Sequence, residues 1–407
     1  MPRLSRPLAF WSVAGLLVLV LAASGVPSPL YRVYQEQFGF GSGVLTLVFG
    51  IYAFALLAAL LVVGSLSDHV GRRPVLAGAL LLQAVAMVVF LAADGVGWLL
   101  AARVLQGLST GALTGSLGAA LLDLQRRDRP LGPLLNSVSP GLGLSLGAVG
   151  AGLAIETIVS PTPWVFGVLT VVFVLGAVLA WALPETSPRL PGALASLRPR
   201  VEVPRPQRRA FLVATPALVA LWAMGGLVLS LGPSLTAGVF GVEDHLVGSL
   251  LILCMQGTAA VGAVLARDLA PRRAMAGGCV VFATAVVGLL VALATGTLWL
   301  LFVAAGIAGL GFGAAFLGSV ATVTAGVSPG HRAGLLSSIF VVGYLAFSIP
   351  AIVAGLAVNT LGLRVVAEVY GVVVIVLAVV AAVGLRLSRP RTPTAVAAEE
   401  PAESLAA

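Results

Sequence analysis

The chain is a succession of long apolar runs separated by short polar segments. A transmembrane helix needs about 20 apolar residues, and twelve runs approach or exceed that length. The runs are rich in Gly, Ala and Leu and lack the short alternation of a β-barrel. They therefore predict an all-α membrane protein with twelve transmembrane helices, at residues 8–26, 43–63, 75–93, 98–122, 131–155, 163–183, 211–232, 246–266, 274–294, 298–325, 333–356 and 365–385.

A polar segment at residues 184–210 divides the runs into two sets of six. It contains six prolines and six arginines, so it cannot cross a membrane as a helix. We expect a flexible connector there, with a short surface helix near residues 192–198. Residues 1–183 then form an N-terminal six-helix bundle and residues 211–387 a C-terminal one. Residues 388–407 have the composition of a disordered tail.

The two halves contain matching segments. Residues 68–73 (Asp-His-Val-Gly-Arg-Arg) match residues 268–273 (Asp-Leu-Ala-Pro-Arg-Arg), and residues 134–137 (Leu-Leu-Asn-Ser) match residues 335–338 (Leu-Leu-Ser-Ser). Such repeats are expected of two homologous bundles related by an axis along the membrane normal, with a substrate site between them near the middle of the membrane. The first aspartate of each matching loop should then lie on the same membrane face.

Composition and charge agree with this picture. The chain is 59% hydrophobic with a mean hydropathy of +1.09, which excludes an ordinary soluble domain. The net charge of +8 does not indicate nucleic-acid binding, because 20 of the 23 basic residues, all arginines, fall on one side if the N-terminus is inside. The exceptions are Arg32 and Arg364, which fall outside, and Arg103, which falls within a run. The positive-inside rule thus places both termini in the cytoplasm and the protein in the cytoplasmic (inner) membrane. Residues 1–25 could alternatively be a cleaved signal peptide, which would leave eleven spans.

The most polar short loop lies between the second and third runs. It carries Gly64, Asp68, Gly71, Arg72 and Arg73 in a chain that is only 9% charged. The pattern Gly-x-x-x-Asp-x-x-Gly-Arg-Arg resembles the signature loop between helices 2 and 3 of the major facilitator superfamily. The sequence departs from that pattern at residue 69, a histidine where the family usually has Arg or Lys.

The resemblance implies the major facilitator fold and a gating role for this loop. In the family, the aspartate approaches the start of helix 11, and the arginine pairs with an acid that ends helix 4. Asp123 ends the fourth run here, so an Arg72–Asp123 pair is expected, as part of a latch that favours the outward-facing state. The alternative is an ordinary loop of the positive-inside kind.

The fourth run carries a polar stripe. At roughly 100° per residue, Arg103, Gln106 and Thr110 share one helix face, and the glycines at positions 107, 111, 115 and 118 form a smooth stripe beside them. An intramembrane charge costs at least ~2.5 kcal/mol, so Arg103 should face a cavity. The Arg-x-x-Gln-Gly segment resembles the helix-4 motif of proton-coupled facilitators, in which the arginine is tied to proton transfer. Alternatively, Arg103 snorkels to the outer surface.

Two weaker resemblances complete the motifs. Residues 143–152 look like a degraded antiporter motif, with Ala148 in place of its proline, or else like a small-residue packing face. Residues 183–186 (Leu-Pro-Glu-Thr) resemble the end of helix 6 in the same superfamily. The glycines at 306, 309, 311 and 313 are expected to serve packing.

These features predict a secondary transporter that works by alternating access, most simply a proton-coupled efflux permease, or antiporter, for drug-like or amphipathic metabolites. Arg103 and Glu156 are the proton-coupling candidates, although Glu156 could equally be a solvated loop carboxylate. The expected partners are a small-molecule substrate, protons and the lipid bilayer, without nucleic acid, and we expect a monomer. The residues expected to line the substrate cavity are Gln106, Thr110, Asn136, Trp222, Met255, Gln256, Phe312, Phe316 and Tyr344.

No cofactor, metal site or enzymatic activity is expected. Cys254 and Cys279 fall within runs and should pack there, while His69, His245 and His331 should be solvated. The principal alternative is a facilitator or proton-coupled importer of sugars or other small polar nutrients, which would need more carboxylates and amides in the cavity. A lipid-modifying enzyme would need a constellation of histidine with an acid at one face. A sensor or scaffold would lack the latch and cavity residues.

Overall fold

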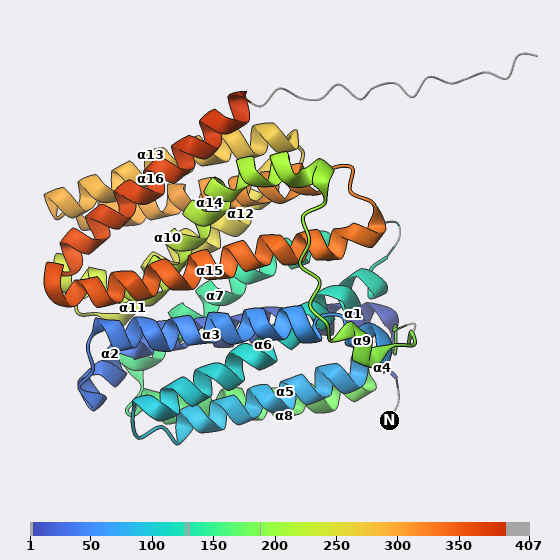
Figure 1. Cartoon of the computed structure of the whole chain (residues 1–407). Helices are drawn as coiled ribbons and strands as arrows, with labels where there is room; N and C mark the ends of the chain where they lie inside the picture. Colours follow the sequence, from blue (N-terminus) through green and yellow to red (C-terminus); the bar gives the residue numbers. More distant parts are fainter. Residues whose placement is uncertain (1–2, 127, 129–130, 188, 388–407) are drawn as a thin grey trace, which may run out of the picture.

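Long helices account for most of the computed structural model, which describes residues 3–126, 128, 131–187 and 189–387. The N-terminal half contains α1 (Arg6–Gly25), α2 (Pro27–Phe38), α3 (Ser42–Val63), α4 (Ser67–Val70), α5 (Arg72–Leu91), α6 (Val96–Leu124), α7 (Gly132–Thr157) and α8 (Pro161–Ala182). The C-terminal half contains α10 (Arg208–Phe240), α11 (His245–Ile252), the π-helix η2 (Leu253–Gly257), α12 (Thr258–Ala266), α13 (Pro271–Thr295), α14 (Leu298–Thr324), α15 (Pro329–Leu361) and α16 (Leu363–Leu387). The two halves lie one above the other in Figure 1.

The prediction of twelve spans in two bundles is confirmed within the described residues. Helices α1 and α2 form one span, as do α11, η2 and α12. Eleven spans are long and apolar enough to cross a membrane. The twelfth is α6, a helix of 29 residues, whose hydropathy is lowered by the same polar and glycine stripes that the sequence displays. Large apolar side chains on α8 and α16 are exposed, as expected of helices that face lipid.

Three predicted spans were too short. The first was predicted to end at residue 26, but α2 extends it to Phe38. Pro27 and Pro29 resemble a loop, yet a proline is tolerated in the first turn of a helix, where its missing N–H is not needed. The span predicted at 211–232 is α10, which continues through Pro233, and the one predicted at 333–356 is α15.

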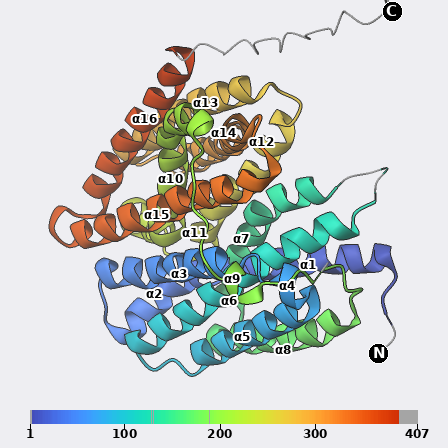
Figure 2. The same cartoon turned by 45° about the vertical axis from the view of Figure 1, so that its right-hand side comes forward.

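The two halves meet along two seams (Figure 2): α3 packs against α15, and α7 packs against α11, η2 and α12. Small residues permit these close approaches. A Cβ added at Gly355 would clash with Thr46, and one added at Gly141 would clash with the backbone of Gln256. We call the end of the molecule where α4 and α9 (Ala193–Ser196) lie the linker end, and the opposite end the far end. Helices α3 and α15 come together toward the far end (Figure 1).

The connector touches both halves at the linker end. In the N-terminal half, Ser65 donates a hydrogen bond of 3.2 Å to the carbonyl of Ser196. In the C-terminal half, the backbone N–H of Glu202 donates to the carbonyl of Gly334 at 3.2 Å. The short surface helix predicted near residues 192–198 is α9, and a 3-10 turn η1 (Arg205–Gln207) precedes α10.

The glycine stripes form helix contacts. In α6, a Cβ at Gly107 or Gly111 would clash with carbonyl groups of α3, and in α7 a Cβ at Gly143 or Gly147 would clash with α1. The glycines of α14 approach η2, α12 and α13 in the same way. The packing interpretation of the glycines in α7 and α14 is therefore confirmed.

Candidate functional site

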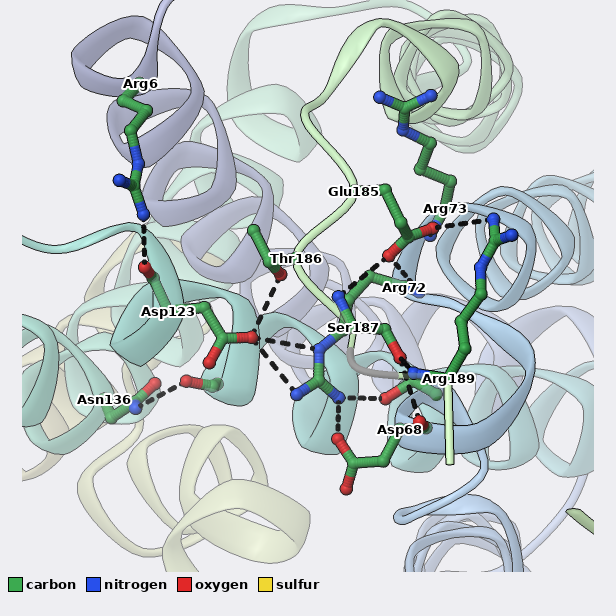
Figure 3. Close-up of polar contacts among 12 residues, drawn as sticks. Arg6, Asp68, Arg72, Arg73, Asp123, Asn136, Glu185, Thr186, Ser187 and Arg189 are labelled. Atoms are coloured by element: carbon green, nitrogen blue, oxygen red, sulfur yellow. Dashed lines mark hydrogen bonds and ion pairs between the residues drawn. The ribbon is translucent and has the colours of Figure 1, made fainter. Parts of the chain in front are cut away.

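The first polar site is the loop at the linker end, and Arg72 is its centre (Figure 3). The Arg72 side chain is 6% exposed, and its Nη1 lies 2.6 Å from Asp68 Oδ1. Its Nη2 lies 3.2 Å from Asp123 Oδ2, and Nη1 also donates to Ser67 Oγ at 2.5 Å. The ion pair that the sequence predicted between Arg72 and Asp123 is thus present, with Asp68 as a second carboxylate.

Glu185 completes this site, and the sequence analysis did not select it. Its carboxylate accepts the backbone N–H groups of Arg72 at 2.8 Å and Arg73 at 3.4 Å. These N–H groups begin α5, where the helix dipole favours a negative charge. Thr186 next to it donates to Asp123 at 3.0 Å. The segment at residues 183–186 that resembles the end of helix 6 was the signal that could have identified it.

The two glycines of the loop have distinct local roles. Gly71 has φ of +119°, a conformation that strongly favours glycine. A Cβ there would also lie 2.9 Å from Glu185 Oε2. Gly64 lies where α6 crosses the end of α3, because the Cβ position of Gly115 is 3.2 Å from Gly64 Cα.

Among the residues that the structure describes, no contact joins Asp68 to the start of α15 in this conformation. Asp68 pairs with Arg72 of its own loop, and its backbone carbonyl accepts hydrogen bonds from Ser187 and Leu190 of the connector. At the start of α15, it is Glu202 of the connector that contacts Gly334. The gating role of the loop remains a prediction.

The second polar site surrounds Arg103, which is buried inside the N-terminal half with 1% of its surface exposed. Its Nε donates to the Tyr31 hydroxyl at 2.7 Å and its Nη1 to Gln106 Oε1 at 2.6 Å; Nη2 also contacts the Tyr31 hydroxyl. The guanidinium carbon lies 5.3 Å from the ring centre of Tyr31 and 4.8 Å from that of Tyr52, within the range of cation–π attraction. Arg103 therefore does not snorkel to a surface.

Tyr31 and Tyr52 are functional candidates that sequence reasoning missed. Tyr31 lies in α2, which the sequence analysis left outside the first span, and Tyr52 lies in α3. The packing of α3 on α6 brings Tyr52 to Arg103, and the hydroxyl of Tyr31 reaches Arg103 from α2. Gln106 is fixed in turn, because its Nε2 donates to the carbonyl of Ala23 at 2.9 Å.

An aromatic cluster of the C-terminal half contains four predicted cavity residues. The ring of Trp222 lies 4.8 Å from that of Tyr344 and 6.0 Å from that of Phe316, centre to centre. Phe312 lies 6.3 Å from Phe316. Phe347, which was not predicted, lies 6.1 Å from Trp222.

Tyr52 connects the two sites. It forms a cluster with Ala53 and Leu56 of α3, against which Tyr344 and Phe347 of α15 pack, while its ring lies under the guanidinium of Arg103. A buried cation of one half and an aromatic cluster of the other are therefore contiguous through one tyrosine. This arrangement suits a ligand that has both a charged or polar group and an apolar body.

The remaining predicted cavity residues lie in different surroundings. Asn136 joins α7 to α6 by donating to the carbonyl of Gly118 at 3.2 Å. Met255 and Gln256 lie in η2, and π-helical turns frequently occur at functional sites. The Thr110 side chain is fully buried in α6. Nε1 of Trp222 and Oε1 of Gln256 have no hydrogen-bond partner among the described residues.

Glu156 and His245 form a contact between the halves at the far end. Glu156 Oε1 accepts the backbone N–H of His245 at 2.8 Å and lies 3.1 Å from its Nδ1. Nearby in sequence, Arg32 of α2 donates to the carbonyl of Glu243 at 2.9 Å. The expectation that His245 is solvated was wrong, because its side chain is only 17% exposed. His245 is the first residue of α11. The structure does not place Glu156 beside Arg103.

Other predicted features are placed as follows. Cys254 and Cys279 are free thiols within helices, as expected of packing residues. The described residues contain no group of three or more His, Cys, Asp or Glu side chains placed to hold a metal ion.

Comparisons with known proteins agree with one another. The family model of the Major Facilitator Superfamily matches residues 13–349. The structure of a bacterial homologue of the human lysosomal transporter Spinster, solved in an inward-facing and unoccupied conformation, superposes with a TM-score of 0.72 at 15% identity, covering 94% of this chain and 97% of that one. The human organic anion transporter MFSD10 superposes with a TM-score of 0.62 at 19% identity, covering 93% of this chain and all of that one (100%).

A curated relative matches part of the chain. The MFS-type transporter paaT of Penicillium rubens is 25% identical over 153 residues, which are 37% of this chain. The match spans only 28% of that transporter's length.

Proposed function

The chain belongs to the Major Facilitator Superfamily, as a multi-pass membrane transporter, and from that premise we propose that it exports drug-like or amphipathic molecules across the cytoplasmic membrane in exchange for protons. The observation that carries the proposal is that Arg103 and Tyr52 of one half adjoin the aromatic cluster of the other. We call this cluster, which consists of Trp222, Phe312, Phe316, Tyr344 and Phe347, the Trp222 cluster. A site shared by two halves is the one that rocking can expose to either side in turn.

We propose that the linker end is cytoplasmic. The arginines of α4–α5, the connector and the start of α13 gather there, as the positive-inside rule requires. The far end, where Glu156 meets His245 and Gly355 packs against Thr46, is then the closed outer gate. In this interpretation the structure is an inward-facing state, and both termini lie in the cytoplasm.

Glu156 is our candidate for the proton carrier. Its carboxylate bridges α7 of one half and α11 of the other, so any opening of the far end must break the bridge and expose the carboxylate to the outside.

The test is transport by purified protein in proteoliposomes, with an imposed pH gradient and a mixed panel of amphipathic and sugar substrates. We expect concentrative accumulation of an amphipathic substrate only when the gradient is present. If wild-type protein equilibrates substrates but never concentrates one under any pH gradient, it is a facilitator and the proposed exchange is wrong.

Glu156→Gln should abolish gradient-driven accumulation, while exchange of substrate down its own gradient persists within about twofold. A glutamine oxygen can still accept the His245 N–H, but the side chain no longer binds and releases a proton. Glu36→Gln, an exposed acid of α2, is the matched control and should behave as wild type. Undiminished accumulation by Glu156→Gln would remove Glu156 from the coupling mechanism.

A further inference from the structure

Arg103 is a buried cation without a counter-ion. No carboxylate of the described residues forms an ion pair with it, although its side chain is almost fully enclosed. Its hydrogen-bond acceptors are the neutral oxygens of Tyr31 and Gln106. Neutral acceptors and ring faces reduce the cost of burying a charge but leave the net charge in place. A ligand that supplies one negative charge would neutralise the site.

The unused hydrogen-bonding capacity around Arg103 consists mainly of donors. A guanidinium has more N–H groups than the contacts with Tyr31 and Gln106 use. The indole N–H of Trp222, whose ring meets that of Tyr344 in the aromatic cluster, also has no hydrogen-bond partner among the described residues. A carboxylate accepts hydrogen bonds and donates none, so it complements such donors.

The surroundings of Arg103 also indicate what kind of group a bound carboxylate ligand would carry. Tyr52 covers the guanidinium and belongs to the cluster of α3 residues against which Tyr344 and Phe347 pack. The Tyr344 ring meets that of Trp222 edge-on. These rings offer a continuous aromatic surface that begins at the charged group. An organic cation would instead meet the like charge of Arg103.

We propose that the cargo is an amphipathic organic anion, whose carboxylate pairs with Arg103 and whose aromatic or apolar body lies on the Trp222 cluster. This inference rests on the transport function proposed above. The carboxylate takes the place of the Gln106 oxygen or the Tyr31 hydroxyl as the acceptor, and these two side chains hold the guanidinium when the cargo is absent.

The experiment measures binding of three probes that share one ring system to purified full-length protein by calorimetry at pH 7.5. The probes are 2-naphthoate (anionic), 2-naphthamide (neutral) and 2-(aminomethyl)naphthalene (cationic). We expect the wild type to bind naphthoate at least about tenfold more tightly than naphthamide. Arg103→Gln should bring the two affinities within about twofold, with the naphthamide affinity unchanged.

Control variants keep the test decisive. Tyr344→Leu should weaken the binding of all three probes and preserve the ratio between naphthoate and naphthamide. If Arg103→Gln does not fold, Arg103→Lys replaces it and should retain a preference for naphthoate, reduced because a lysine lacks the planar fork. The proposal is overturned if wild type shows no naphthoate binding at millimolar concentration, if it binds the neutral or cationic probe equally well, or if Arg103→Gln keeps the preference.

Transport of the same probes distinguishes a failure of the anionic-cargo proposal from a failure of the proposed export function. Exchange of the cationic probe for protons without transport of naphthoate would support the proposed export function and refute the anionic cargo. Preferential naphthoate binding without transport of any probe would refute the exporter and leave the anion site standing.

Discussion

Arg103→Ala abolishes the concentrative, pH-gradient-driven transport of substrate into proteoliposomes. The buried guanidinium of α6 contacts Tyr31 of α2 and Tyr52 of α3, and it stands at the junction with the aromatic cluster of the other half. A hydrogen bond to a charged group contributes about 1.5–3 kcal/mol, and Arg103 forms such bonds with both Tyr31 and Gln106. We therefore expect a loss of at least about 30-fold in the initial rate of accumulation.

Arg103→Lys should restore only part of this activity, because it keeps the charge but cannot bond Tyr31 and Gln106 with a planar fork. The removal of Arg103 also leaves two buried acceptors without donors, so the melting temperature of each purified variant must accompany its transport rate. Arg364→Ala, at an exposed arginine of the far end, is the control. If Arg103→Ala still concentrates substrate against a gradient, Arg103 has only a structural role.

Asp68→Asn reduces transport roughly tenfold by changing the equilibrium between the two conformations, and leaves folding largely intact. Asp68 is 38% exposed and shares Arg72 with Asp123, so the arginine keeps one carboxylate in the variant. The effect should come from the outward-facing state, in which we expect Asp68 to contact the start of α15 around residues 333–336. Its loss then favours the inward-facing state.

Asp268→Asn is the matched control, because Asp268 occupies the corresponding position of the other half. It is 85% exposed and pairs with its neighbour Arg267, and we expect transport within about twofold of wild type. Equal effects of the two substitutions, or normal kinetics in Asp68→Asn, would show that the loop between α3 and α5 is not a latch.

The helices and their division into two halves could be predicted because membrane spans are encoded locally, in runs of apolar residues. The prediction was wrong where local signals mislead, as at the prolines that begin α2. The Arg72–Asp123 pair was also predictable, since the resemblance to a known loop supplied the distant partner. The motif at residues 183–186 gave a hint of Glu185, but not that its carboxylate would cap α5.

The surroundings of Arg103 could be predicted only in part. Gln106 lies three residues away on the same helix, so helical periodicity identified it. Tyr31 and Tyr52 come from other helices, and their position depends on how α3 packs on α6 and on where α2 ends up relative to Arg103. The contact between Glu156 and His245 depends on how one half docks on the other, which leaves no trace in the sequence of either helix.

Alternating access can be followed through the distance between the two halves at both ends, by electron spin resonance on pairs of spin labels. One pair is placed at Arg126 and Arg267 of the linker end, the other at Gln37 and Thr360 of the far end, on a background in which Cys254 and Cys279 are replaced by alanine. We predict that substrate and a pH gradient change the two distances in opposite directions, with the far end opening as the linker end closes. Distances that stay fixed, or that increase together at both ends, would contradict this prediction.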